Sequence, residues 1–434
     1  MLPQGSRFRI SDDSPESRQS RAAPSAERDG PPRGAAALDT YTGFEAAPSR
    51  TEQSPKYDPE TGEVLPPFDP VAKWELQAKA RRFLPEHKRL WKCHLVRYSE
   101  VPVEVRTAKA SGKAFYGGLM VCGLVWLCPV CAAKVQKVRA DELHEGLTRW
   151  VAAGGVVELV TYTVPHGRSD SLQRLDAGLR RAYRQLVGSR GYRALQEELG
   201  VVGSVVSQEV TWGEVTGWHP HLHVLRFRLG ESGAGRSGAC TASTAPDSHS
   251  ELRLFELWRE AVGRAGLGVA SPKAFKVQDA THAARYVAKL GSEALTWRTA
   301  DELVRSHSKR GREGRMTPFD FLRAGVVGLA GPWRQLWREY AEVYRGRHQL
   351  RYSPGLRDLL GTLDARTDDQ VAASIGEPYA LLQTLTDDDW QVVRSAGPRA
   401  RGELLQVAEL HGVDGIRHYL AALRARAVVP AVVT

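Results

Sequence analysis

Three histidines occupy alternate positions in one short, mostly apolar segment, "WHPHLHVL" (218–225). Side chains alternate between the two faces of a β-strand, so His219, His221 and His223 would project from the same face. Imidazoles that are buried need partners, and the usual partners are carboxylates, phosphates or a metal ion. The chain has only 13 histidines. Three at this spacing therefore favour a metal site over the exposed polar face of a half-buried strand.

The preceding segment, "SVVSQEVTWG" (204–213), alternates as strands do and leads into a glycine-containing turn. If Trp212 pairs with Trp218 across this hairpin, Glu209 lies opposite His221 on the same face. Two imidazoles and a carboxylate on adjacent strands would leave coordination positions open. Such a set suits Mg²⁺, Mn²⁺, Zn²⁺ or Fe²⁺, and the ligands alone do not choose among these ions.

Four of the five cysteines lie in one part of the sequence. These are Cys93, Cys122, Cys128 and Cys131. The segment "CGLVWLCPVC" ends in a Cys-x₂-Cys turn with an internal proline, a common zinc half-site because tetrahedral Zn²⁺ takes thiolates from a tight turn. We expect all four to bind a structural zinc, with His94 as a neighbouring substitute. Redox use or unliganded buried cysteines are the alternatives, although a thioredoxin-type motif would need a βαβ context that the sequence does not indicate.

The chain as a whole is basic. Its 434 residues carry a formal net charge of +10, although the first 70 residues hold more acidic than basic side chains. A basic body suits a polyanionic partner, most simply nucleic acid. The segment that follows the cysteines is basic and has a helical pattern, and it offers Lys134 and Lys137 for contact with phosphate.

The sequence predicts a cytoplasmic chain without membrane contact. No apolar run approaches the roughly 18 residues of a membrane span, and the first residues lack the apolar block of a signal peptide. Residues 1–70 are rich in Pro, Ser, Glu, Gly and Arg, which predicts a disordered tail. A second low-complexity stretch, 230–250, is typical of an inserted surface loop.

A helical pattern in "DATHAARYVAKLGSEAL" (279–295) places Tyr286 and Lys289 one turn apart on one face. A tyrosine beside a lysine is usually only part of an amphipathic surface. Beside a metal site it has a chemical use. A metal to polarise a phosphodiester, a tyrosine oxygen to attack it and a lysine to hold the phosphate form a complete set for phosphoryl transfer.

Three segments together resemble the ordered motifs of HUH endonucleases. They are "ELVTYTVPH" (158–166), "GWHPHLHVL" (217–225) and "RYVAKL" (285–290). More narrowly, they resemble the rolling-circle replication initiators of small plasmids from Gram-positive and actinomycete bacteria, over roughly residues 85–360 of this chain. The histidine segment followed by the YVAK segment is a specific signal, whereas either alone would be weak.

The resemblance implies an α+β fold, in which an antiparallel sheet flanked by helices follows a cysteine-rich module and precedes a helical region. Together with the composition and the helical pattern from about residue 318 onward, the resemblance divides the chain into a tail (1–70), a zinc module with a linking helix (71–145), the nuclease domain (146–300) and a mostly helical C-terminal region (301–434).

The resemblance also implies roles for individual residues. His221 and His223 would hold Mg²⁺ or Mn²⁺ with Glu209 as third ligand, and His219 is a further candidate ligand beside them. Tyr286 would attack the DNA, leaving a 5′-phosphotyrosine link and a free 3′-OH that primes synthesis. Lys289 would orient the phosphate.

Two more residues have expected roles, and one position departs from the family. Thr161 and Thr163 would lie on a strand that supports the site. Several relatives carry a glutamate one turn before the tyrosine, where it activates water to end the cycle. Here that position is His282. His282 would serve as the base, Asp279 would do so in its place, or termination runs differently.

The partners implied are origin DNA, single-stranded or extruded as a cruciform, together with a host helicase and a DNA polymerase. The alternatives are a single-tyrosine HUH transposase and, from another class, a zinc-containing DNA-binding regulator without catalysis. A conjugative relaxase fits less well, because relaxases place the tyrosine before the histidines, whereas here Tyr286 comes after them.

Overall fold

The computed structural model describes residues 71–98, 100–230, 248–279, 315–361, 366–374 and 378–428. The predicted tail, most of the predicted loop 230–250, and Tyr286, Lys289 and His282 lie outside the described residues. Two compact units are present, and each combines segments that are distant in sequence. Among the described residues, unit 1 holds 79–90 and 122–374, and unit 2 holds 71–78, 91–121 and 378–428.

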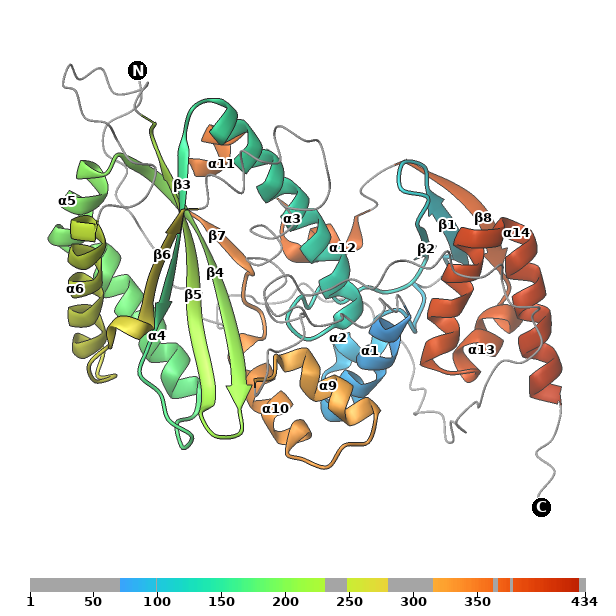
Figure 1. Ribbon diagram of the computed structural model, residues 1–434. Helices are drawn as coiled ribbons and strands as arrows, with labels where there is room; N and C mark the ends of the chain where they lie inside the picture. The colour runs from blue at the N-terminus through green and yellow to red at the C-terminus, as the bar shows by residue number, and fades with distance from the viewer. Residues whose placement is uncertain are drawn as a thin grey trace, which may run out of the picture. The chain divides into compact units, whose positions relative to one another are not determined.

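Unit 1 contains a five-stranded antiparallel sheet in the order β6-β3-β5-β4-β7. Its strands are β3 (Val156–Thr163), β4 (Val201–Gly213), β5 (Gly217–Arg228), β6 (Phe275–Asp279) and β7 (Leu350–Tyr352). The two longest strands, β4 and β5, form a hairpin within this sheet (Figure 1). The hairpin has the predicted register, in which Trp212 pairs with Trp218 and Glu209 with His221.

The turn of this hairpin depends on a glycine. Gly217 has a φ of 71°, and a Cβ at this position would lie 2.8 Å from the Cα of Arg168. Both the left-handed backbone and the close approach of a neighbouring loop therefore require a residue without a side chain. The turn fixes the register, and the register decides which side chains of β4 and β5 share a face.

Helices cover both faces of the sheet. Helices α4 (Leu172–Gly188), α5 (Arg190–Glu198) and α6 (Ser248–Arg264) lie on one side, and α3 (Pro129–Ala152) lies on the other (Figure 1). The rings of Tyr183 from α4 and Trp258 from α6 pack on Tyr162 of β3, with centroids 5.8 and 4.9 Å away. We call the opposite face, which carries the three histidines, the histidine face.

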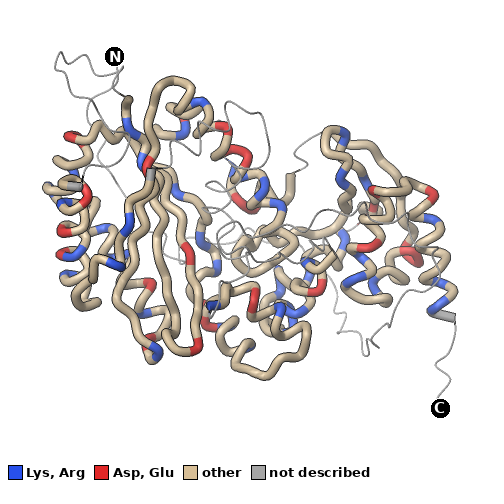
Figure 2. Tube along the Cα trace, viewed as in Figure 1, with Lys and Arg blue, Asp and Glu red and all other residues tan. Residues whose placement is uncertain are grey.

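One end of the histidine face is an apolar core. Leu225 and Phe227 continue this face beyond His223, and they pack with Leu143, Leu147 and Trp150 of α3. Figure 2 shows that charged residues gather on the helices and that the strands carry few of them. The polar cluster of the histidine face is therefore an exception within a mainly apolar sheet, which favours a functional reason for it.

Short helices complete unit 1: η3 (Pro272–Ala274), α9 (Pro318–Val326), α10 (Trp333–Tyr344), α11 (Leu356–Leu359) and α12 (Asp368–Ala373). Helix α9 begins with a capping box between Thr317 and Asp320. Phe321 of α9 packs on both tryptophans of the hairpin end, with ring centroids 6.2 Å from Trp212 and 5.8 Å from Trp218. Residues after position 301 thus contribute both helices and the edge strand β7.

Unit 2 is a smaller α+β body. Its sheet has the order β2-β1-β8, formed by β1 (Val103–Ala108), β2 (Ala114–Gly117) and β8 (Tyr379–Leu385). Helices α13 (Asp387–Ser395) and α14 (Pro398–Val428) follow, and α14 is interrupted at Gly412, where φ is 59°. Tyr116 ties this unit together, because its hydroxyl donates to the carbonyl of Arg401 and its ring contacts Trp390.

Helices α1 (Ala72–Phe83) and α2 (Lys88–Lys92) each cross a sequence boundary between the units.

Within the part of the chain that the structure describes, no helix combines the length and the apolar content needed to cross a membrane. The expected α+β class, with antiparallel sheets and helices, is confirmed.

Candidate metal site on the central sheet

Glu209, His221 and His223 meet on the histidine face, and we call these three residues the metal group. One ligand atom of each lies within 4.8 Å of the others. The Oε2 atom of Glu209 lies 3.2 Å from Nε2 of His221 and 3.0 Å from Nε2 of His223. The convergence follows from two local rules: residues i and i+2 of β5 share a face, and the hairpin register sets Glu209 opposite His221.

Outer partners orient both imidazoles. The Nδ1 atom of His221 lies 3.3 Å from the carbonyl oxygen of His219, and Nδ1 of His223 lies 3.1 Å from Oγ1 of Thr161. A carbonyl only accepts, so Nδ1 of His221 carries a proton, and in the neutral form of the ring Nε2 presents a lone pair. Metal-binding histidines have this arrangement, with one nitrogen held by a second group and the other turned to the ion.

The group fits a divalent cation. A neutral His221 turns an acceptor nitrogen toward a carboxylate oxygen, which is favourable only with a proton or a cation between them. Two ligands about 2.1 Å from one ion at a right angle lie about 3.0 Å apart, close to the 3.0 and 3.2 Å found here. The two distances from Glu209 therefore match neighbouring positions in one coordination sphere.

The electrostatics of Glu209 favour its ionised form. Burial raises the pKa of this carboxyl, but the charges and hydrogen bonds of His221 and His223 outweigh burial and hold the pKa well below its usual range. The carboxylate is thus ready to act as a ligand at neutral pH. His221 and His223 are themselves buried, with exposed fractions of 9% and 7%.

His219 has different partners from the other two histidines. Its ring stacks on His166, with centroids 4.5 Å apart and planes at 22°. Its Nδ1 lies 2.9 Å from the guanidinium of Arg315, which donates to it. Burial, together with the charges of His221, His166 and Arg315, lowers the pKa of His219 to about 2. The ring is therefore neutral, and its role as a metal ligand remains a prediction.

The two threonines of β3 lie beside the site. Thr161 pairs with His223 and Thr163 with His221 in the strand register, and the hydroxyl of Thr163 donates to the carbonyl of Ala274. Tyr162, between them, would be the next candidate nucleophile if Tyr286 were not the one. It lies on the opposite face, fully buried, so it cannot reach a phosphate at the metal group.

The other expected catalytic residues are not placed by the structure. Tyr286, Lys289 and His282 lie outside the described residues. Asp279, the alternative base, is the last residue of β6 and pairs with Glu158 of β3. The first residue of β6 pairs with Tyr162, which is four positions further along β3. The roles of these residues remain predictions.

The four expected cysteines form a buried cluster that could bind a metal such as zinc. The sulfur atoms of Cys93, Cys122, Cys128 and Cys131 all lie within 4.8 Å of one another, and none of these cysteines forms a disulfide. Those of Cys122 and Cys131 are 3.6 Å apart. Zinc–sulfur bonds of about 2.3 Å place tetrahedral thiolates about 3.8 Å apart, so the cluster has the dimensions of a zinc site.

Two further cysteine-region residues have defined places. The expected substitute ligand, His94, turns Nδ1 to within 3.2 Å of the Cys93 sulfur. Cys128 is the residue that precedes α3, with Pro129 at the first helical position. The helix thus begins inside the Cys-x₂-Cys turn, which explains why the turn is tight.

The lysines expected to contact phosphate are engaged by other groups. Lys134 donates to the carbonyls of Ala372 and Ser374 at the end of α12, and burial lowers its pKa. Lys137 forms an ion pair of 2.8 Å with Asp141 in the next turn of α3. Their contact with DNA remains a prediction.

The histidine face carries a cation that sequence reasoning missed. Lys276 of β6 pairs with Thr161, which in turn pairs with His223, so all three project from the histidine face. Lys276 is exposed. The alternating polar and apolar residues of "FKVQD" (275–279) indicate a strand. That this strand lies beside β3 is known only from the tertiary pairing.

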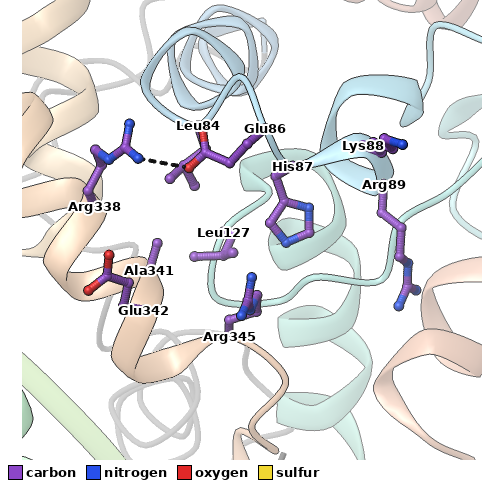
Figure 3. A pocket seen from close by; sticks show the side chains of 10 residues that line it. All are labelled: Leu84, Glu86, His87, Lys88, Arg89, Leu127, Arg338, Ala341, Glu342 and Arg345. Carbon is purple, nitrogen blue, oxygen red and sulfur yellow. Dashed lines mark ion pairs between the residues drawn. The ribbon is translucent and has the colours of Figure 1, made fainter. Parts of the chain in front are cut away.

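A cavity of about 300 Å³ lies elsewhere in unit 1 (Figure 3). Its lining comes from residues 84–89, Leu127 and α10, and none of it belongs to the metal group. An ion pair between Arg338 and Glu86 spans the rim.

The chain is 30% identical over 344 residues to "Protein rep" of Streptomyces lividans, a match that covers 65% of this chain and 74% of that protein. It belongs to the family of this Rep protein. It is also 29% identical over 282 residues to "Neomycin resistance protein" of Streptomyces cyanogenus, covering 58% of this chain and 61% of that one. No family model matches this Rep chain, and no solved structure matches it either.

Proposed function

We propose that the chain initiates rolling-circle replication of a plasmid by nicking one strand of origin DNA. Membership of the Rep family supports a role in plasmid replication. The observation that carries the nicking activity is the group of Glu209, His221 and His223 on two neighbouring antiparallel strands. A replication protein that only binds DNA has no use for this group.

A divalent ion, Mg²⁺ or Mn²⁺, would polarise the scissile phosphate when bound. Glu209, His221 and His223 would hold it, and Thr161 would fix the ring of His223 through its contact with Nδ1. The three ligands lie on strands rather than loops, which keeps their positions fixed before DNA arrives.

Tyr286 is the proposed nucleophile, assigned by the resemblance of "RYVAKL" to the tyrosine motif. Its phenol oxygen attacks the phosphorus as the phenol loses its proton, and the bond from phosphorus to the 3′ oxygen breaks. The products are a phosphotyrosine at the 5′ side and a free 3′ oxygen, which takes up a proton to become the 3′-OH that primes synthesis. Lys289, one turn further on, would hold a phosphate oxygen.

At the end of a round, a water whose proton His282 accepts, in place of the glutamate found in relatives, would cleave the strand at the regenerated nick site. The 3′-OH that this cut releases would then attack the phosphotyrosine, displace Tyr286 and rejoin the ends. The partners we propose are the plasmid origin, presented as a single strand or cruciform, and a host helicase and polymerase that use the 3′-OH. The cysteine cluster would hold a structural Zn²⁺ that is separate from the catalytic ion.

Incubation with 3′-end-labelled single-stranded origin DNA and Mn²⁺ tests the proposal. We expect label to become covalently attached to the protein and to be lost with Tyr286→Phe. A regulator without catalysis would bind the DNA and form no covalent product. Transfer between transposon ends, but not at an origin on the gene's own replicon, would favour the transposase over the replication initiator.

A further inference from the structure

Arg315 is fixed beside the metal group by its backbone. The next residue, Met316, exchanges two hydrogen bonds with Trp212 of β4, with nitrogen-to-oxygen distances of 2.8 and 2.7 Å. This bridge holds the chain along the edge of the hairpin close to its turn. Side chains alternate along extended backbone, so Arg315 projects to the side opposite Met316, where it meets His219 on the histidine face.

The side chain of Arg315 joins two stacked imidazoles. Its NH1 group donates to Nδ1 of His219 over 2.9 Å, and the His219 ring stacks on His166 from the segment after β3. The Nδ1 atom of His166 lies 3.1 Å from the carbonyl of Val164, so that ring is also held. Three separate segments therefore converge on one position.

The guanidinium keeps most of its binding capacity. It has five N–H donors in a planar fork, and the contact with His219 uses one. That contact is with a neutral ring, so the positive charge is not balanced there. Among the described residues Arg315 forms no ion pair, and it is exposed. An exposed arginine held in one orientation without a carboxylate suits a bidentate anionic ligand, above all a phosphate.

The position next to the metal group identifies which phosphate this is. The rings of His166, His219, His221 and His223 form a row, with successive centroids 4.5, 5.1 and 4.9 Å apart. Arg315 contacts His219, and the next ring in this row, His221, belongs to the metal group. A strand whose scissile phosphate lies at Glu209, His221 and His223 would bring a neighbouring phosphate to Arg315.

We propose that Arg315, oriented by the stacked His166 and His219 rings, binds a backbone phosphate of the DNA single strand next to the phosphate that is cleaved. The inference rests on the proposed function. It assigns the row of histidines two tasks: His221 and His223 belong to the metal group, and His166 and His219 hold the arginine.

Salt dependence of DNA binding tests this subsite without any need for cleavage. The probe is a fluorescein-labelled oligothymidylate, and the protein is the full chain with no Mg²⁺ or Mn²⁺ added. Arg315→Gln removes the charge and retains an amide N–H for Nδ1 of His219. We expect the slope of log K against log salt to fall in magnitude by about 0.7, the value of one phosphate contact on a single strand. Affinity at moderate salt should fall about threefold to fivefold.

Two other variants make the result specific. Arg315→Lys keeps the charge and should retain most of the slope. Arg259→Gln removes an exposed arginine from α6, which packs on the opposite face through Trp258, and should leave slope and affinity near wild type. An Arg315→Gln protein with the same slope as Arg259→Gln would overturn the subsite. Covalent transfer by the wild-type protein would still support the proposed function in that case. A wild-type protein that neither binds the probe nor forms the adduct would overturn both.

Discussion

Glu209 and His221 face one another across the β4–β5 hairpin, and Oε2 of the first lies 3.2 Å from Nε2 of the second. Since Nδ1 of His221 is directed at a carbonyl, both facing atoms are acceptors in the neutral state of the ring. The contact is stable only with a proton or a cation between the two atoms, and a bound divalent ion would supply that cation.

Loss of a proposed ligand should weaken metal binding. We expect His223→Ala to reduce Mn²⁺ affinity more than about 100-fold, because changes to outer partners alone cost about 10 to 100-fold. Titration of the DNA-free protein, followed by calorimetry or by Mn²⁺ electron paramagnetic resonance, gives the affinity. His249→Ala, which changes an exposed histidine of α6, should bind as wild type does. Equal affinity of all three proteins would exclude the metal group.

The hydroxyl of Thr161 should matter for the same ion. Valine has nearly the same shape as threonine but cannot form the hydrogen bond with Nδ1 of His223, so Thr161→Val should lower Mn²⁺ affinity by about tenfold. Thr161→Ser retains a hydroxyl and should recover most of the affinity. If the valine variant binds as tightly as wild type, the threonine only fills space in the strand.

Tyr286→Phe should abolish covalent attachment to DNA and leave DNA binding nearly unchanged, because it removes only the attacking oxygen. Gel analysis of label transfer measures the first effect and fluorescence anisotropy the second. Tyr162→Phe is the matched control. Among the described residues the Tyr162 hydroxyl has no hydrogen-bond partner although it is buried, so this variant should keep full activity without loss of stability. Transfer at the wild-type rate by Tyr286→Phe would show that another group attacks.

The cysteine cluster should hold one zinc ion. Cys131→Ser should lose that zinc, measured by mass spectrometry of the metal content, and Tm should fall by about 5 °C or more, because a structural zinc contributes directly to folding. Cys240→Ser changes the remaining cysteine of the sequence and should alter neither quantity. Zinc-free wild-type protein with the same Tm as the zinc-loaded protein would contradict this prediction.

The low pKa of His219 predicts acid sensitivity. Its pKa is about 2 in the folded protein and near 6.5 in an unfolded chain. Between these values the unfolded chain binds the proton and the folded one does not, so stability falls as pH drops below about 6.5. This residue alone contributes a loss of about 1.4 kcal/mol per pH unit.

His219→Gln keeps an acceptor for Arg315 and cannot titrate. Between pH 7 and pH 5.5 its Tm should therefore fall less than that of the wild-type protein, with neither Mg²⁺ nor Mn²⁺ added. Parallel loss of Tm in the two proteins would mean that His219 takes up a proton in the folded state near its usual pKa.

The sequence by itself determined the local part of the metal group. The alternation of "WHPHLHVL" and the glycine turn specify a hairpin, and a hairpin of this register leaves little freedom for Glu209, His221 and His223. The same holds for Cys128 and Cys131, whose spacing is set by one tight turn at the start of α3. The resemblance added the roles of Tyr286 and Lys289, which remain predictions.

Tertiary structure decided which partner each histidine has. Strand alternation places His219, His221 and His223 on the same face and does not distinguish them. They differ only in the groups that they contact. Thr161 comes from β3, His166 from the segment after it, and Arg315 from a segment 96 positions beyond His219. Such contacts have no signal in local periodicity, because they depend on long-range pairing that packing selects after the strands have formed. The strand positions of β7 and β8 were missed in a region expected to be mostly helical for the same reason: each is stabilised by a partner strand far away in the sequence.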